Sequence, residues 1–164
     1  MSDDNVHFAG SEIVELGIQV EVNGKEFYDG IAEKSKNPDA KKVFSSLAME
    51  EEKHVEDFKK ILDPVSKYEP VESYPEEYFS YINAVAREHI FTKKDKGREI
   101  AKAVSTDKQA IEMAIGFEKD SILFYEGVKR IVPEHDKKLL DKLIEQEKIH
   151  LQKLWDLRKS KGGF

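Results

Sequence analysis

Apolar residues recur at intervals of three and four along most of the chain, which predicts four long amphipathic helices. They are expected at about residues 11–35, 39–62, 106–131 and 134–159. Asn37 is placed to cap the second helix, and Asp63-Pro64 is expected to end it. Thr106, with Gln109 three positions later, predicts a capping box at the start of the third helix.

Residues 63–105 have a different composition, with three prolines and few regular apolar stripes. One shorter helix is expected from about Glu76 to His89, and the basic run from Lys93 to Arg98 is interpreted as a solvated loop. A connection of this length allows the chain to cross from one end of a bundle to the other. The sequence therefore predicts one all-α domain over residues 1–164, a four-helix bundle with a long crossover between helices two and three.

Polar residues interrupt the apolar stripes in a repeated pattern. The second and fourth helices each carry a Glu-x-x-His motif, and the first and third each carry a Glu seven residues before a Tyr. Residues three apart on a helix share one face, so each motif projects a carboxylate and an imidazole together. The pattern resembles a duplicated helical hairpin, and its candidate metal ligands are Glu21, Glu51, His54, Glu118, Glu147 and His150.

Four carboxylates and two imidazoles on buried faces predict a site for two divalent cations, whose charge would balance that of the carboxylates. Without metal, each buried and unpaired carboxylate would cost several kcal/mol. Oxygen-rich ligands with one imidazole per ion favour iron, with manganese or zinc as alternatives. Each imidazole is expected to donate its other ring nitrogen to an acceptor that the sequence does not identify.

Tyr28 and Tyr125 are candidate catalytic residues, because each lies two turns after a candidate ligand. They could hydrogen-bond to ligand carboxylates or take part in electron transfer, and the alternative is ordinary core packing. Glu112 is expected to be solvated, and surface or loop positions are expected for the remaining histidines, His7, His89 and His135. Glycines within the long helices are interpreted as points of close helix packing: Gly17, Gly24, Gly30, Gly116 and Gly127.

The amino-acid composition excludes several classes of site and partner. The sequence contains no cysteine, which excludes disulfides, thiolate catalysis and cysteine-ligated iron–sulfur clusters. The net charge is −6 with acidic and basic residues interspersed, so no nucleic-acid partner is expected. No segment has the length and apolarity of a membrane span or a secretory signal, and a cytoplasmic location is expected.

With these motifs in place, the chain resembles the rubrerythrin-like branch of the ferritin-like di-iron carboxylate superfamily. The resemblance implies that the six ligands bind two irons, with Glu51 and Glu147 bridging and Glu21 and Glu118 terminal. Two features depart from the family pattern. Ser121 stands where a further carboxylate is expected one turn after Glu118, and a cysteine-ligated rubredoxin domain is lacking.

The resemblance implies an oxidoreductase that reduces peroxide or dioxygen with electrons from an external donor protein, and a homodimer. Two alternatives remain open at this point. One is an iron-handling protein that acts in ferroxidation, storage or delivery. The other is a structural or sensory bundle whose partner surface depends on metal occupancy.

Overall fold

A computed structural model describes residues 10–67, 76–130, 132 and 134–160, which are almost entirely helical. The elements are α1 (Gly10–Lys34), α2 (Pro38–Lys67), α3 (Glu76–Glu88), the 3₁₀ turn η1 (Ile90–Thr92), α4 (Lys96–Ala103), α5 (Asp107–Val128) and α6 (Glu134–Ser160). The expected all-α bundle with a long crossover is confirmed, and α1, α2, α5 and α6 are its four long helices.

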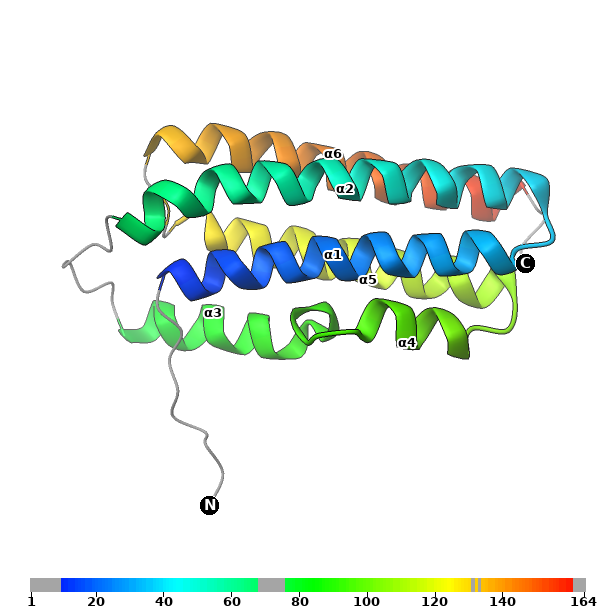
Figure 1. Cartoon of the computed structure of the whole chain (residues 1–164), viewed down its shortest axis with the longest axis horizontal. Helices are drawn as coiled ribbons and strands as arrows, with labels where there is room; N and C mark the ends of the chain where they lie inside the picture. Colours follow the sequence, from blue (N-terminus) through cyan, green and yellow to red (C-terminus); the bar gives the residue numbers. More distant parts are fainter. Residues whose placement is uncertain (1–9, 68–75, 131, 133, 161–164) are drawn as a thin grey trace, which may run out of the picture.

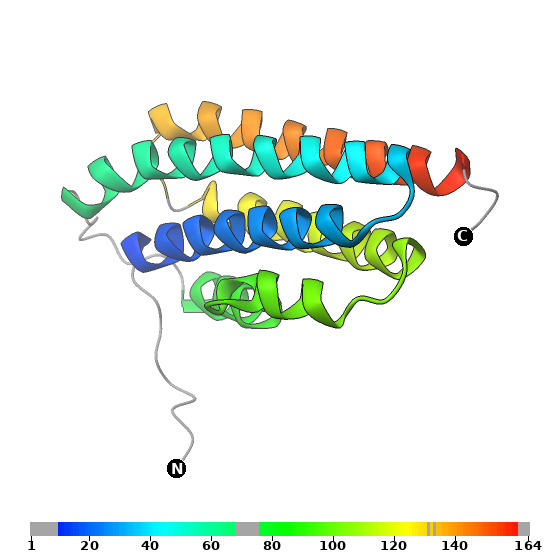
Figure 2. The same ribbon diagram turned by 45° about the vertical axis from the view of Figure 1, so that its right-hand side comes forward.

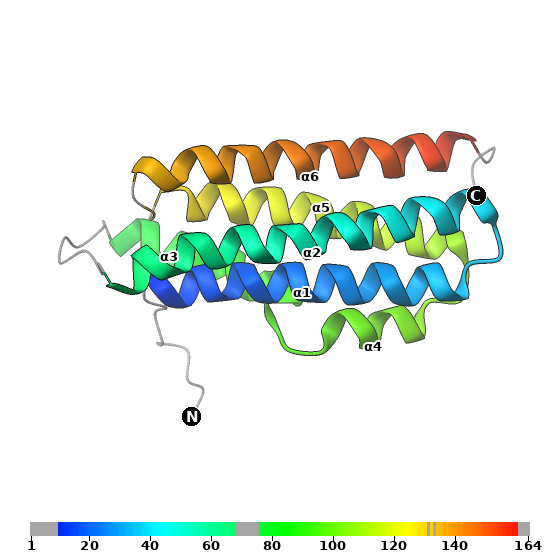
Figure 3. The same ribbon diagram turned by 45° about the horizontal axis from the view of Figure 1, so that its top comes forward.

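The helices are arranged in three layers. In Figures 1 and 2, α2 and α6 form one outer layer, α1 and α5 the middle layer, and α3 and α4 the other outer layer. Figure 3 shows the four long helices aligned along one axis, with α3 and α4 carrying the crossover from one end to the other. Since α1 and α5 are covered on both sides, polar side chains that point inward from them lie far from solvent.

The predicted helix starts are confirmed by their caps. Asn37 Oδ1 accepts hydrogen bonds from the backbone N–H groups of Asp39 (3.0 Å) and Ala40 (3.1 Å). Thr106 Oγ1 accepts from the Gln109 N–H at 3.1 Å. The Gln109 side chain returns to the Ser105 N–H at 2.9 Å, one residue before the position that a capping box predicts.

Two boundaries in residues 63–105 were predicted wrongly. The second helix continues through Asp63-Pro64 to Lys67. A proline removes one helical hydrogen bond, and a long helix can tolerate that loss near its end. The basic run is also not all loop, because Lys96 begins α4. This helix is only eight residues long, and a helix of that length depends on tertiary contacts for its stability.

Asn23 on α1 provides buried polar contacts that hold the crossover. Its side chain is fully buried, and Nδ2 donates to the backbone oxygens of Phe91 (2.7 Å) and Lys93 (2.6 Å). Its Oδ1 accepts from the Gly97 N–H at 3.0 Å. A Cβ at Gly97 would lie 2.0 Å from the Asn23 backbone oxygen, so glycine is required for this approach. One asparagine therefore fixes both η1 and the start of α4 against the bundle.

Close packing explains most of the helical glycines. A Cβ would lie 2.6 Å from Phe58 at Gly17, 2.6 Å from Ala101 at Gly30 and 2.2 Å from Ile82 at Gly127. At Gly24 the nearest contact, to Glu51, would be an ordinary 3.5 Å. The prediction is wrong for Gly116, where a Cβ would meet nothing within 4 Å.

No helix in the described part of the chain is long and apolar enough to cross a membrane.

Candidate metal centre

The structure brings all six predicted ligands together in the middle of the bundle. Glu21 comes from α1, Glu118 from α5, and the two Glu-x-x-His motifs from α2 and α6. Each of the six residues is at most 3% exposed. They form two overlapping groups, Glu21–Glu51–His54–Glu147 and Glu51–Glu118–Glu147–His150, and within each group one ligand atom per residue lies within 4.8 Å of the others.

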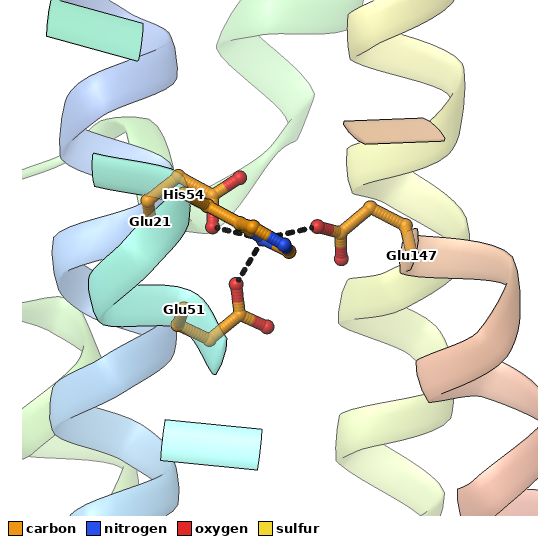
Figure 4. Close-up of side chains that lie close together, drawn as sticks. All are labelled: Glu21, Glu51, His54 and Glu147. Atoms are coloured by element: carbon orange, nitrogen blue, oxygen red, sulfur yellow. Dashed lines mark hydrogen bonds and ion pairs between the residues drawn. The ribbon is translucent and has the colours of Figure 1, made fainter. Parts of the chain in front are cut away.

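In the first group, three carboxylates surround the imidazole of His54 (Figure 4). Its Nδ1 is 2.8 Å from Glu147 Oε1, 3.1 Å from Glu51 Oε2 and 3.3 Å from Glu21 Oε2. Figure 4 shows Glu147 approaching from the side opposite to Glu21 and Glu51. The two hairpins therefore both contribute to this group.

The second group repeats this arrangement around His150. Its Nδ1 is 3.2 Å from Glu51 Oε1, 3.5 Å from Glu147 Oε2 and 3.7 Å from Glu118 Oε1. Glu51 and Glu147 thus present one oxygen toward His54 and the other toward His150. The two rings are nearly parallel, with centroids 5.3 Å apart. Two carboxylates shared in this way have the geometry of bridges between two ions.

The acceptors of the outer ring nitrogens, which the sequence did not identify, are now defined. His54 Nε2 lies 2.8 Å from Gln146 Oε1, and His150 Nε2 lies 2.8 Å from Glu50 Oε2. Hydrogen bonds of this kind orient the imidazoles so that both Nδ1 atoms face the carboxylates. Gln146 and Glu50 each directly precede a shared Glu in the sequence. That repeated position is the signal that could have identified them.

Tyr28 and Tyr125 link the two hairpins by exchanging partners. The Tyr28 hydroxyl on α1 donates to Glu118 Oε1 on α5, and the Tyr125 hydroxyl on α5 donates to Glu21 Oε1 on α1. Both tyrosines are buried. Each therefore contacts the candidate ligand of the other hairpin and not the Glu two turns earlier on its own helix.

Burial and mutual repulsion divide the carboxyl groups into two classes. Burial, together with the negative charges of Glu51 and Glu147, raises the pKa of Glu21 and of Glu118 well above the ordinary range. Burial also disfavours ionisation of Glu51 and Glu147. Close polar contacts with their protonated neighbours outweigh the effect of burial, so the pKa of each of these two carboxyls is lowered.

For the two imidazoles, the effect of the neighbouring charges on the pKa outweighs the effect of burial. Burial alone would lower the pKa of His54 and of His150, but the surrounding carboxylates raise both values far above the ordinary range. Without metal, the centre therefore contains two carboxylates, two imidazolium groups and two neutral carboxylic acids. Its charges cancel, which explains how six ionisable groups can share a dry core.

This donor set fits metal ions. Among the described residues, three buried side-chain atoms have no hydrogen-bond partner, and two of them, Glu147 Oε1 and His150 Nδ1, face this centre. Glu147 Oε1 is close to His54 Nδ1, but in an orientation that forms no hydrogen bond. Buried polar atoms are seldom left unpaired, and a cation would be a partner for both. Oxygen-rich ligands with one imidazole in each group suit iron or manganese.

A small cavity of about 10 Å³ adjoins the centre between α1 and α5, and its lining includes Glu21, Tyr28, Glu118 and Ser121. It has room for roughly one water-sized molecule. A larger groove of about 580 Å³ lies between α1, α2 and α4 and contacts none of the six candidate ligands. The small cavity therefore fits only a very small molecule next to the cluster.

His89 lies in the short link between α3 and η1, which agrees with the expected loop position, but the expected surface position is wrong. Its side chain is 1% exposed, and its Nε2 lies 3.0 Å from Ser121 Oγ beside the small cavity. Burial lowers the pKa of His89 to about 4, so this imidazole is neutral. A signal for this burial was present, because His89 lies seven residues after the buried Ile82 and on the same side of the predicted short helix. Its partner Ser121, on α5, could not be identified from the sequence.

The remaining predictions for single residues agree with the structure where it describes them. Glu112 is exposed and pairs with Arg158 at 3.0 Å. His135 is exposed, with 69% of its side chain accessible. His7 lies outside the described residues.

The bundle and its buried Glu–His cluster define a ferritin-like di-iron carboxylate protein. The family model described as Rubrerythrin matches residues 12–158, and the chain belongs to the rubrerythrin family. A solved structure from Thermotoga maritima, described as a candidate ferritin-like diiron-carboxylate protein, is similar with 29% sequence identity and a TM-score of 0.67. The similarity covers 93% of this chain and 96% of that one. No protein with a curated description matches the chain.

Proposed function

We propose that this protein is a di-iron oxidoreductase that reduces peroxide or dioxygen with electrons from a separate donor protein. Two irons would be held by the two overlapping groups. Glu21 and His54 would serve one iron, Glu118 and His150 the other, and Glu51 and Glu147 would lie between them. When bound in the reduced state, such a pair supplies the two electrons needed to cleave one O–O bond.

One observation carries this proposal. The carboxylates of Glu51 and Glu147 each direct one oxygen toward His54 and the other oxygen toward His150. A single-ion site would need no such sharing. A single ion at the His54 end would also need neither Glu118 nor His150 as a ligand. The duplicated geometry is therefore explained by a pair of ions.

The other residues of the chain fit a small oxidant. The cavity beside Glu118 admits only a molecule of a few atoms, which favours peroxide or dioxygen over larger substrates. Tyr28 and Tyr125 hold protons at their hydroxyl oxygens, in contact with Glu118 and Glu21. From there they can steady the terminal carboxylates and take part in proton or electron transfer. The surrounding apolar core keeps bulk water away from the reacting atoms.

Electrons are proposed to come from another protein. These 164 residues contain no cysteine and so hold no rubredoxin-type iron site. A partner that transfers one electron at a time would return the centre to its reduced state after each turnover.

The test is stopped-flow absorbance of ferrous-loaded protein mixed with hydrogen peroxide, and separately with dioxygen. Oxidation should be much faster than that of free ferrous ion, and Glu51→Ala or Glu147→Ala should abolish paired-metal binding. Glu112→Ala, the same change at an exposed carboxylate on α5, should leave both binding and oxidation unchanged. Oxidation no faster than that of the free ion would refute the proposal.

Ser121 favours iron oxidation as a second candidate function. It provides no carboxylate one turn after Glu118, so α5 offers no alternative carboxylate ligand at that place. A ferroxidase would oxidise successive iron ions with dioxygen and would not need an electron donor. Several turnovers of added ferrous iron without a donor would support this candidate. Size-exclusion chromatography would then distinguish a small oligomer, such as the homodimer proposed on family grounds, from a storage cage.

A further inference from the structure

We propose that the two ends of the centre are unequal, and that Glu50 makes the His150 end the tighter metal site. This inference rests on the proposed di-metal function and deepens it by assigning an order of loading. The His150 end would bind the first ion, and the His54 end would bind the second, weaker and more exchangeable one.

The two ends are otherwise closely matched. Glu50 directly precedes Glu51 on α2, and Gln146 directly precedes Glu147 on α6. Each reaches across to the imidazole of the opposite helix, and both hydrogen bonds measure 2.8 Å. Position, direction and length are the same in both pairs. The chemical difference is a carboxylate oxygen at one end and an amide oxygen at the other.

That difference changes the imidazole as a ligand. A carboxylate accepts a stronger hydrogen bond than a neutral amide and draws the Nε2 proton toward itself. The ring then carries more electron density at Nδ1, the atom that faces the candidate metal position. Carboxylate–histidine–metal arrangements raise ligand basicity in this way, and loss of the outer partner typically costs 10- to 100-fold in metal affinity.

Lys153 keeps the Glu50 carboxylate in place. Its Nζ lies 2.7 Å from Glu50 Oε1, while Oε2 receives the His150 hydrogen bond. The two contacts use different oxygens, so the lysine fixes the orientation of the carboxylate without displacing the imidazole. The corresponding position on α2, six residues after Glu51, is Asp57, which pairs instead with Lys60 on its own helix. The asymmetry therefore extends to the residues behind the acceptor.

The test exchanges the two acceptors. Crystals of metal-free protein are loaded with one equivalent of Co²⁺, and anomalous scattering locates the ion in wild type, Glu50→Gln, Gln146→Glu and the double variant. The double variant contains the same two groups and the same net charge in exchanged places. Glu52→Gln makes the same change as Glu50→Gln at an exposed neighbouring position on α2 and serves as the matched control.

Wild type and Glu52→Gln should place Co²⁺ at the His150 end, and the double variant should place it at the His54 end. Glu50→Gln alone should weaken the first binding step in solution by roughly 10- to 100-fold and spread the ion over both ends. Equal occupancy in wild type, or the same preferred end in the double variant, overturns this inference and leaves the proposed function standing. If wild type binds no Co²⁺ at either end, both fail.

Discussion

Metal loading should release protons, because the metal-free centre is neutral only while four of its groups hold them. Glu21 and Glu118 remain carboxylic acids through burial and the charges of their neighbours. His54 and His150 remain imidazolium groups because carboxylates surround them. Ions that bind to oxygen and Nδ1 ligands replace a proton at each of these four groups.

The expected magnitude is about four protons released for each pair of divalent ions at pH 7, since ligands must lose their protons to bind metal. Each released proton makes binding more favourable by about 1.4 kcal/mol per pH unit, so loading of the pair should gain roughly 5.5 kcal/mol per unit of rising pH. This dependence should persist until the first of the four groups loses its proton in the metal-free protein.

Isothermal titration calorimetry measures this directly. Zn²⁺ is titrated into metal-free protein at pH 7 in buffers of different ionisation enthalpy, and the slope of observed enthalpy against buffer enthalpy gives the number of protons. Glu118→Gln is the matched variant, because its amide has no proton to lose, and it should release about one proton fewer. Release of one proton or none by the wild-type protein would show that this account of the charges is wrong.

Three further predictions concern stability. Gly97→Ala should destabilise the fold by several kcal/mol, because its Cβ would meet the Asn23 backbone oxygen at 2.0 Å, whereas Gly116→Ala should be neutral or stabilise it by about 1 kcal/mol. Urea denaturation of the two variants compares them, and equal losses would contradict the docking of α4. Tyr125→Phe should cost about 1–3 kcal/mol, because Glu21 loses a buried hydrogen-bond donor, with metal stoichiometry unchanged. An unchanged melting temperature would argue against that bond. The metal-free protein should also melt at lower temperature as pH rises from 6 to 9. Its buried acids and imidazoles have raised pKa values and retain protons that the unfolded chain releases, and stability present below the unfolded pKa values is therefore lost as pH rises. A melting temperature that rises from pH 6 to pH 9 would contradict the raised pKa values of these buried groups.

Helical periodicity predicted the long helices and the faces that carry the candidate ligands. This worked because a Glu or His within an apolar stripe must be buried with the stripe, and two motifs repeated in the same order restrict how the helices can meet. The shared positions of Glu51 and Glu147 were implied by the family resemblance and not by periodicity, and each of the two carboxylates contacts both imidazoles.

The crossover could not be predicted in the same detail, because its structure depends on tertiary contacts. Helix α4 is held by Asn23 and by Lys34, whose Nζ donates to the backbone oxygens of Ala101 (3.0 Å) and Lys102 (2.9 Å). Neither residue lies near α4 in the sequence. The partner of His89 was missed for the same reason, since Ser121 belongs to α5.

The acceptors behind the two imidazoles also escaped the sequence analysis. Gln146 and Glu50 sit beside the ligands on helices whose relative register only the structure fixes. The tyrosines were expected near carboxylates, but the exchange of partners between hairpins depends on how α1 and α5 face each other.

The central claim is that two metal ions occupy the interior of this bundle. Anomalous scattering from crystals grown anaerobically with ferrous iron tests it most directly. We expect two iron peaks about 3.5–4 Å apart, one beside His54 and one beside His150, with Glu51 and Glu147 between them. A map with no peak among these residues, or with iron bound only at the surface, would contradict it.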